Sequence, residues 1–219
     1  MVNYLIFTLA SSVQYIGMLV LMFSLFRINY RWYIPQIVFV CISLSYLSYT
    51  MRVADHAMYA TFVQMGCLII FIWLLFRFQI FYAAVMAITG SIIFAMLDLA
   101  VAFFVSLFSP QIDQFSLEMY LVAFFSGSIA IGIALFIRRK NYGFSYVPHD
   151  EDAAVNYKEK ENLMLLFVAI LSVISFAGTY FFTAQFGNST SFLIVSLLLF
   201  LSSSILISIS RKKERKEVS

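Results

Sequence analysis

Long apolar runs follow one another along the chain and are separated by short polar breaks. Roughly 20 apolar residues are needed for a helix to cross about 30 Å of hydrocarbon. Runs such as IIFIWLLF and FLIVSLLLFL show no alternation of apolar and polar residues, so a β-barrel fits the sequence poorly. The pattern therefore predicts an all-α integral membrane protein, a seven-transmembrane-helix bundle. The predicted spans are residues 4–26, 33–51, 57–76, 80–107, 117–137, 162–184 and 190–210.

The composition predicts a single polytopic membrane domain over residues 1–219. Hydrophobic residues make up 63% of the chain and charged residues only 11%, whereas about 25% of a soluble domain is charged. The first apolar run has no basic start and is too long for the core of a signal peptide, so we expect a retained helix. Cys41 and Cys67 fall within predicted spans, where we expect small buried side chains and no disulfide framework.

The basic residues orient the predicted spans. With the N terminus outside, 13 of the 14 Lys and Arg residues lie on the cytoplasmic side, many of them in the loop 138–161 and the tail 211–219. Only Arg52 falls outside, where the short loops carry Asp55, Asp113 and Glu118. Because basic residues are enriched in cytoplasmic loops, we expect the N terminus outside and the C terminus in the cytoplasm. The expected location is the plasma membrane of a bacterium.

Polar side chains within the spans gather toward the outer side. A charge at the bilayer centre costs about 2.5–3.5 kcal/mol, so such residues usually face a bundle interior or a wet cavity. One interpretation is an outer cavity that binds a ligand and contains an Asp98–Arg52 pair. The other is that Asp98 hydrogen-bonds to neighbouring hydroxyls and only holds helices together. The candidate ligand-binding residues are Asp98, Arg52, Tyr46, Gln14 and Gln64.

Small residues recur along the fifth span. Gly127, Ser128 and Gly132 include spacings that allow two helices to approach closely. We expect these residues to pack helices within the bundle. A homodimer face is the alternative.

The last span is followed by the basic sequence RKKERKEVS. Basic residues next to a membrane attract anionic lipid headgroups at about 1 kcal/mol each. Contact with a protein partner is the alternative role for this segment. The residues concerned are Arg211, Lys212, Lys213, Arg215 and Lys216.

The sequence lacks the motifs of the common membrane enzymes. It contains no HExxH, GxSxG or Walker motif and no paired acidic motif, and no lysine lies within a span. We expect no enzymatic activity, no cofactor, no metal site and no nucleic-acid partner.

Three segments resemble a known family of sensors. The stretches RWYIPQIVFVCISLSYLSYTMR and LLFRFQIFYAAVMAITGSIIFAMLDLAV and the element GFSYVP are similar to parts of the membrane sensor domain of accessory-gene-regulator-type peptide-pheromone receptor histidine kinases. In that family a phosphoacceptor helix and an ATP-binding domain follow the last span, and neither precedes Ser219 here. The resemblance implies a sensor or regulatory membrane subunit without the kinase output domain.

The main functional hypothesis is therefore a membrane sensor. It would bind an extracellular small molecule or peptide in the outer polar cavity and signal to a membrane or cytoplasmic protein partner, or to a second copy of itself. Two alternatives remain open from the sequence. One is a small transporter or the substrate-binding membrane subunit of an importer, and the other is an immunity or accessory protein for a secreted peptide.

Overall fold

All regular structure that the computed structural model describes is helical. The described residues are 2–54, 56–108, 115–148, 162–171, 173–174 and 189–218. Five of the described helices are long and apolar enough to cross a membrane, as expected of a multi-pass membrane protein. The helices are α1 (Val2–Leu25), η1 (Tyr30–Tyr33), α2 (Ile34–Val53), α3 (Ala57–Phe76), α4 (Ile80–Ser106), α5 (Leu117–Arg139), a shorter apolar helix at Asn162–Leu171, and α7 (Ser189–Val218).

Helices α1 to α5 begin and end within two residues of the first five predicted spans. Local sequence signals explain several of these ends. Pro35 lies in the first turn of α2, where a missing N–H costs nothing. Ser116 caps α5 by accepting a hydrogen bond from the backbone N–H of Met119 at 3.2 Å. Arg77 ends α3 in the left-handed conformation, with a φ of 58°.

The predictions for the C-terminal part of the chain are only partly covered by the described residues. The loop residues 149–161, residues 175–184 of the sixth predicted span, and Asp55 and Asp113 lie outside them. The seventh predicted span falls within α7, which continues through the basic segment to Val218. Lys, Arg and Glu favour helix, so the charged sequence extends α7 instead of ending it.

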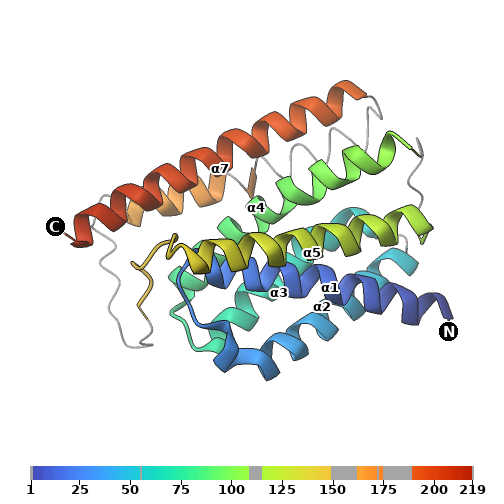
Figure 1. Ribbon diagram of the computed structural model, residues 1–219, viewed down its shortest axis with the longest axis horizontal. Coiled ribbons are helices and arrows are strands. Elements are labelled where there is room, and N and C mark those ends of the chain that lie inside the picture. The colour runs from blue at the N-terminus through green and yellow to red at the C-terminus, as the bar shows by residue number, and fades with distance from the viewer. Residues whose placement is uncertain are drawn as a thin grey trace.

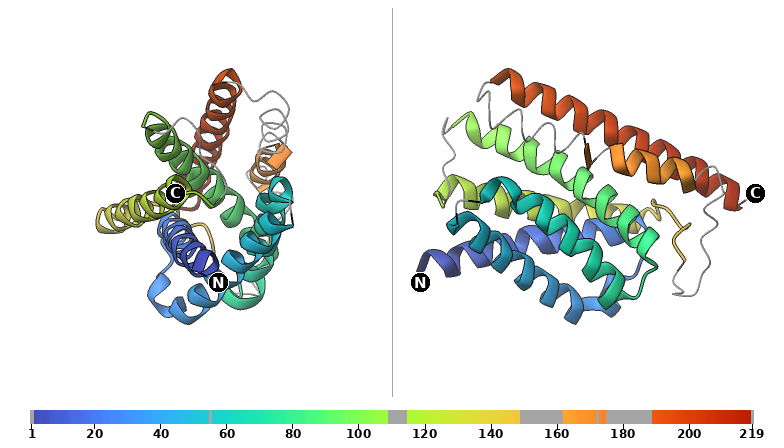
Figure 2. Two further views of the ribbon diagram at one scale, coloured as in Figure 1. Left: turned by 90° about the vertical axis from the view of Figure 1, so that its right-hand side faces the viewer. Right: turned by 180° about the vertical axis from the view of Figure 1, so that it is seen from behind.

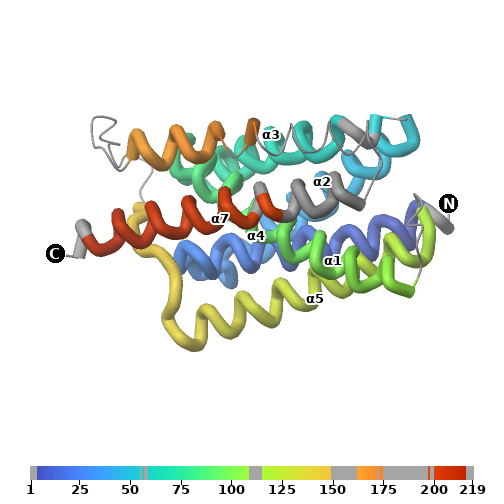
Figure 3. The backbone as a smooth tube through the Cα atoms, turned by 90° about the horizontal axis from the view of Figure 1, so that it is seen from above, coloured from blue at the N-terminus to red at the C-terminus, as the bar shows by residue number. Residues whose placement is uncertain are grey.

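Helix α1 is at the centre of the bundle. It packs most extensively on α5 and also contacts α2 and α4, while α3 contacts α2 and α4. Helix α7 packs on α4, on the side of α4 that faces away from α1 and α5 (Figure 1, Figure 2). Viewed from above, the helices run close to a common direction, and the start of α1 and the end of α7 lie at opposite ends of it (Figure 3).

Two glycines bring α1 and α5 into backbone contact. A Cβ added to Gly17 would lie 2.4 Å from the carbonyl oxygen of Gly127, and one added to Gly127 would lie 2.5 Å from the carbonyl oxygen of Val13. Ser128 and Gly132 instead face away from the bundle, and a Cβ on Gly132 would meet nothing within 4 Å. Of the three residues predicted to pack helices in the bundle, only Gly127 does so. At about 100° per residue, Ser128 points about 100° and Gly132 about 140° away from the direction of Gly127.

Aromatic side chains fill the end of the bundle where α1 and α3 finish. The rings of Phe23 and Phe76 lie 5.0 Å apart between centroids, and Tyr33 is 5.4 Å from Phe76 and 6.4 Å from Phe78. Phe23, Phe76 and Phe78 are almost completely buried. This half of the bundle is therefore a closely packed core.

The GFSYVP element packs against this same end. Gly143 has a φ of +129°, and a Cβ there would lie 2.7 Å from the carbonyl oxygen of Leu25, so the position requires glycine. The backbone N–H of Phe144 donates to that carbonyl at 2.7 Å. Phe144 and Tyr146 are buried, each with its ring centroid 5.9 Å from that of Phe26. The element closes the end of α1.

Candidate ligand-binding cavity

A cavity of about 530 Å³ lies at the opposite end of the bundle from the aromatic core. It is lined by residues 7–18 of α1, 44–52 of α2, 60–68 of α3, 91–102 of α4 and 119–123 of α5, and by Val173. In Figure 1 this is the end where α1 begins. Most lining side chains are apolar, with a few polar groups among them, which is the usual composition of small-molecule sites.

Two hydrogen-bonded pairs cross the cavity at mid-depth. The Nε2 of Gln14 on α1 donates to Oδ1 of Asp98 on α4 at 3.0 Å. The hydroxyl of Tyr15, the next residue on α1, donates to Oε1 of Gln64 on α3 at 2.9 Å. The electrostatic partners of Asp98 also include Ser126 and Arg52. Each pair joins two helices, so the polar groups of the cavity also stabilise its walls.

Arg52, in the last turn of α2, supplies a positive charge to the cavity. Its Nη1 lies 3.9 Å from the sulfur of Met119, and its guanidinium carbon is 5.9 Å from the centroid of the Phe7 ring. Its Nε is buried and has no hydrogen-bond partner. Arg52 and Asp98 line the same cavity but form no direct ion pair. The Asp98–Arg52 pair of the first interpretation is therefore not formed, and Asp98 accepts a hydrogen bond from Gln14.

Aromatic rings surround Phe7 beside Arg52. The Phe7 centroid lies 5.5 Å from that of Tyr49 and 5.6 Å from that of Phe115, and Tyr4 makes an edge contact with Tyr49 at 4.9 Å. These residues come from the ends of α1 and α2 and from the turn before α5. They form an apolar wall beside the guanidinium.

The structure brings together four of the five predicted ligand-binding residues. Gln14, Gln64, Asp98 and Arg52 line the cavity. Tyr46 is absent from its lining, and 57% of the residue is exposed on the outer surface of the bundle.

Tyr46 is excluded by its helical phase. It lies two positions before Ser48, about 200° around α2, so it cannot share the face that Ser48 and Arg52 present to the cavity. Sequence reasoning also missed two lining residues of α1, Ser11 and Tyr15. Ser11 precedes Gln14 by three positions and Tyr15 by four, which places Ser11 beside both on the helix surface, and this spacing was the signal that could have identified them.

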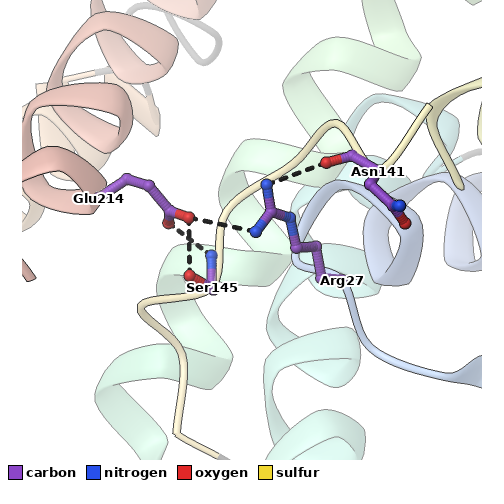
Figure 4. Close-up of polar contacts among 4 residues, drawn as sticks. All are labelled: Arg27, Asn141, Ser145 and Glu214. Carbon is purple, nitrogen blue, oxygen red and sulfur yellow. Dashed lines mark hydrogen bonds and ion pairs between the residues drawn. The ribbon is translucent and has the colours of Figure 1, made fainter. Parts of the chain in front are cut away.

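At the opposite end, α7 is joined to the rest of the protein by a polar network (Figure 4). The carboxylate of Glu214 accepts hydrogen bonds from the backbone N–H and the hydroxyl of Ser145 at 2.5 and 2.7 Å. Nη1 of Arg27 lies 3.5 Å from the same carboxylate, and its Nη2 donates to the carbonyl oxygen of Asn141 at 2.9 Å. The network connects α7, the end of α1 and the loop after α5.

Lys213 is the exception among the basic residues predicted to meet lipid headgroups. It is 1% exposed, and its Nζ donates to Oδ1 of Asn162 at 2.5 Å. Nζ also lies 5.1 and 4.7 Å from the ring centroids of Tyr82 and Tyr146. The prediction was wrong for this residue, because Lys213 is on the face of α7 that packs against the protein. Arg211, Lys212 and Arg215 are exposed, and the side chain of Lys216 lies outside the described structure.

Comparisons of the chain with protein-family models, curated proteins and solved structures found no match. Within the described residues, no group of three or more His, Cys, Asp or Glu side chains is close enough to hold a metal ion. The function must therefore be argued from the cavity and from the network at α7.

Proposed function

We propose that the protein is a non-enzymatic, multi-pass membrane sensor that binds an extracellular ligand in the cavity enclosed by helices α1 to α5. The observation that carries the proposal is the gathering of Gln14, Arg52, Gln64 and Asp98 in one largely apolar cavity. Polar side chains within membrane spans cost free energy of insertion, so they usually mark functional sites.

The proposed topology has seven spans, with the N terminus outside and the C terminus in the cytoplasm of a bacterial cell. The distribution of basic residues supports this orientation. In it the cavity opens toward the outside, and the exposed Arg211, Lys212 and Arg215 lie at the cytoplasmic surface. A partner protein or anionic lipid would contact α7 there.

The packing of the opposite half favours a sensor over a transporter. Phe23, Phe76 and Phe78 fill the space below the cavity, and the residues that the structure describes form no polar path past them. The network around Glu214 and the buried Lys213 supplies a rigid connection between the helices that line the cavity and α7. Ligand binding would change the position of α7 through α4, against which it packs.

Cysteine accessibility tests the proposed site and its orientation. On a background with Cys41→Ala and Cys67→Ala, Thr61→Cys places one thiol in the cavity wall. We expect a membrane-impermeant maleimide to label it in right-side-out vesicles and not in inverted ones. Labelling from the cytoplasmic side alone would overturn the orientation, and labelling from both sides would favour a transporter.

Two control proteins define the limits of that experiment. The Cys67→Ala variant keeps only Cys41, which is 1% exposed, and should stay unlabelled from either side. On the cysteine-free background, Lys140→Cys lies on the exposed turn after α5 and should react only in inverted vesicles.

A purification from native membranes then tests signalling: a stoichiometric kinase or response protein supports a sensor, whereas an ATPase pair would indicate an importer.

A further inference from the structure

We infer that the ligand of this cavity is an apolar chain that ends in a single acidic group, either a carboxylate or a phosphate, and that Arg52 binds the acidic group. The inference rests on the proposed function, because it concerns the same cavity. It adds the chemical class of the ligand and the direction in which it lies.

The state of the Arg52 side chain is the first observation. A guanidinium has five N–H donors in a planar fork and no acceptor. Among the described residues, the one hydrogen-bond acceptor of Arg52 is the weak sulfur of Met119, 3.9 Å from Nη1, and its Nε is buried without a partner. The Phe7 ring and the charge of Asp98 also act on the guanidinium, but neither accepts a hydrogen bond from it. The oxygens of a carboxylate or phosphate fit this fork with two parallel hydrogen bonds. The site thus contains a positively charged group with N–H donors that are free to bind an anion.

The state of Asp98 is the second observation. Its Oδ1 already accepts from Gln14 at 3.0 Å, and it makes no ion pair with Arg52. Tyr15 and Gln64 likewise satisfy each other at 2.9 Å. Within the described lining, the buried side-chain polar atom that has no hydrogen-bond partner is therefore the Nε of Arg52. Because it belongs to a cation, it favours an anionic ligand over a cationic one.

The lining residues give the direction of the ligand. Phe7 and Arg52 lie at the outer end of the cavity, while Met18, Leu44 and Leu68 line its deep end. From Phe7 to Met18, α1 rises roughly 16 Å at 1.5 Å per residue. An extended apolar chain fits this depth, with its acidic group left beside Arg52 near the opening. The two bonded pairs lie alongside the chain and present few free polar atoms to it.

Protection of the cavity thiol tests the ligand class. The full-length Thr61→Cys protein, without its native cysteines, is reconstituted in phosphatidylcholine nanodiscs and labelled in the presence of dodecanoate, dodecyl phosphate, methyl dodecanoate or dodecylamine. We expect an acidic probe to halve the labelling rate at a concentration at least about tenfold below that of the ester and the amine. Dodecanoate and dodecyl phosphate then separate a carboxylate ligand from a phosphate ligand.

Variants of Arg52 supply the decisive comparison. Arg52→Gln should remove the advantage of the acid over the ester, and Arg52→Lys should keep only part of it because lysine lacks the planar fork. Arg31→Gln, on the exposed turn of η1, should leave the ratio unchanged. Because all discs have the same lipid, partitioning of each probe cancels between variants. Arg52→Met serves as a second test if Arg52→Gln does not fold.

The results separate the ligand class from the proposed function. Equal protection by acid, ester and amine, or a full acid preference in Arg52→Gln, would overturn the ligand class. If the thiol is reached from the outside but no probe protects it, the ligand class is wrong and the external cavity stands. If the maleimide never reaches the thiol, both proposals fail.

Discussion

The close approach of α1 and α5 gives the most direct test of the structure. Gly127→Ala would place a Cβ 2.5 Å from the carbonyl oxygen of Val13, whereas ordinary contacts begin near 3.4 Å. Neither atom belongs to a flexible side chain, so the two helices must separate by about 0.9 Å. A radial gap of that size forfeits up to about half of each dispersion contact. We expect the substitution to lower the free energy of unfolding by about 1–3 kcal/mol.

Gly132→Ala is the matched control on the same helix. Its Cβ would meet nothing within 4 Å, so we expect a change within about 0.5 kcal/mol. Gly17→Ala should destabilise like Gly127→Ala, because its Cβ would lie 2.4 Å from the Gly127 carbonyl oxygen. The double variant should cost less than the sum of the two, since the first substitution already separates the helices.

The measurement is unfolding of the purified protein in mixed micelles with increasing dodecyl sulfate, followed by far-ultraviolet circular dichroism. Gly127→Ala should unfold at a lower mole fraction of dodecyl sulfate than Gly132→Ala. If the two variants unfold together, α1 and α5 do not cross at these glycines and the packing described here is wrong.

Three further predictions use the same unfolding assay. Lys213→Ala should lower the free energy of unfolding by about 2–3 kcal/mol, because it removes a buried charged hydrogen bond and two ring contacts. Lys212→Ala, at the exposed neighbouring position, should change it by less than about 0.5 kcal/mol. Equal effects of the two substitutions would show that Lys213 is not buried. Tyr15→Phe should cost about 1 kcal/mol by removing the bond to its glutamine partner on α3, and no change would argue against that bond. A double-mutant cycle of Arg27→Gln and Glu214→Gln should give a coupling of about 0.2–1 kcal/mol that weakens with salt, because the pair is partly exposed, and strict additivity would show that the two charges do not interact.

The helical periodicity of the spans predicted much of the cavity. On α4, helical spacing places Ser91, Phe94, Ala95, Val101 and Ala102 on the face of Asp98, and all of these except Val101 line the cavity. This succeeded because an α-helix fixes which residues share a face, and the alternating directions of successive spans fix which halves meet. The sequence could therefore assign the polar residues of four helices to one end of the bundle.

The pairing of those residues could not be predicted in the same way. Helical phase brings Arg52 and Asp98 to one cavity, but a distance of a few ångströms decides whether they touch, and Gln14 occupies the position beside Asp98. Tyr46 was assigned to the cavity from its depth alone, and the rotation of α2 turns it outward.

The sequence by itself determined the all-helical class and the bounds of the five helices that are long and apolar enough to cross a membrane, because length and composition are properties of each helix separately. Only the tertiary structure decided which of two adjacent residues faces a neighbour. Gly127 touches α1 while Ser128 faces outward, and Lys213 is buried while Lys212 is exposed. These differences depend on helix rotation and on partners such as Asn162, which are distant in sequence. Local patterns carry no information about such contacts.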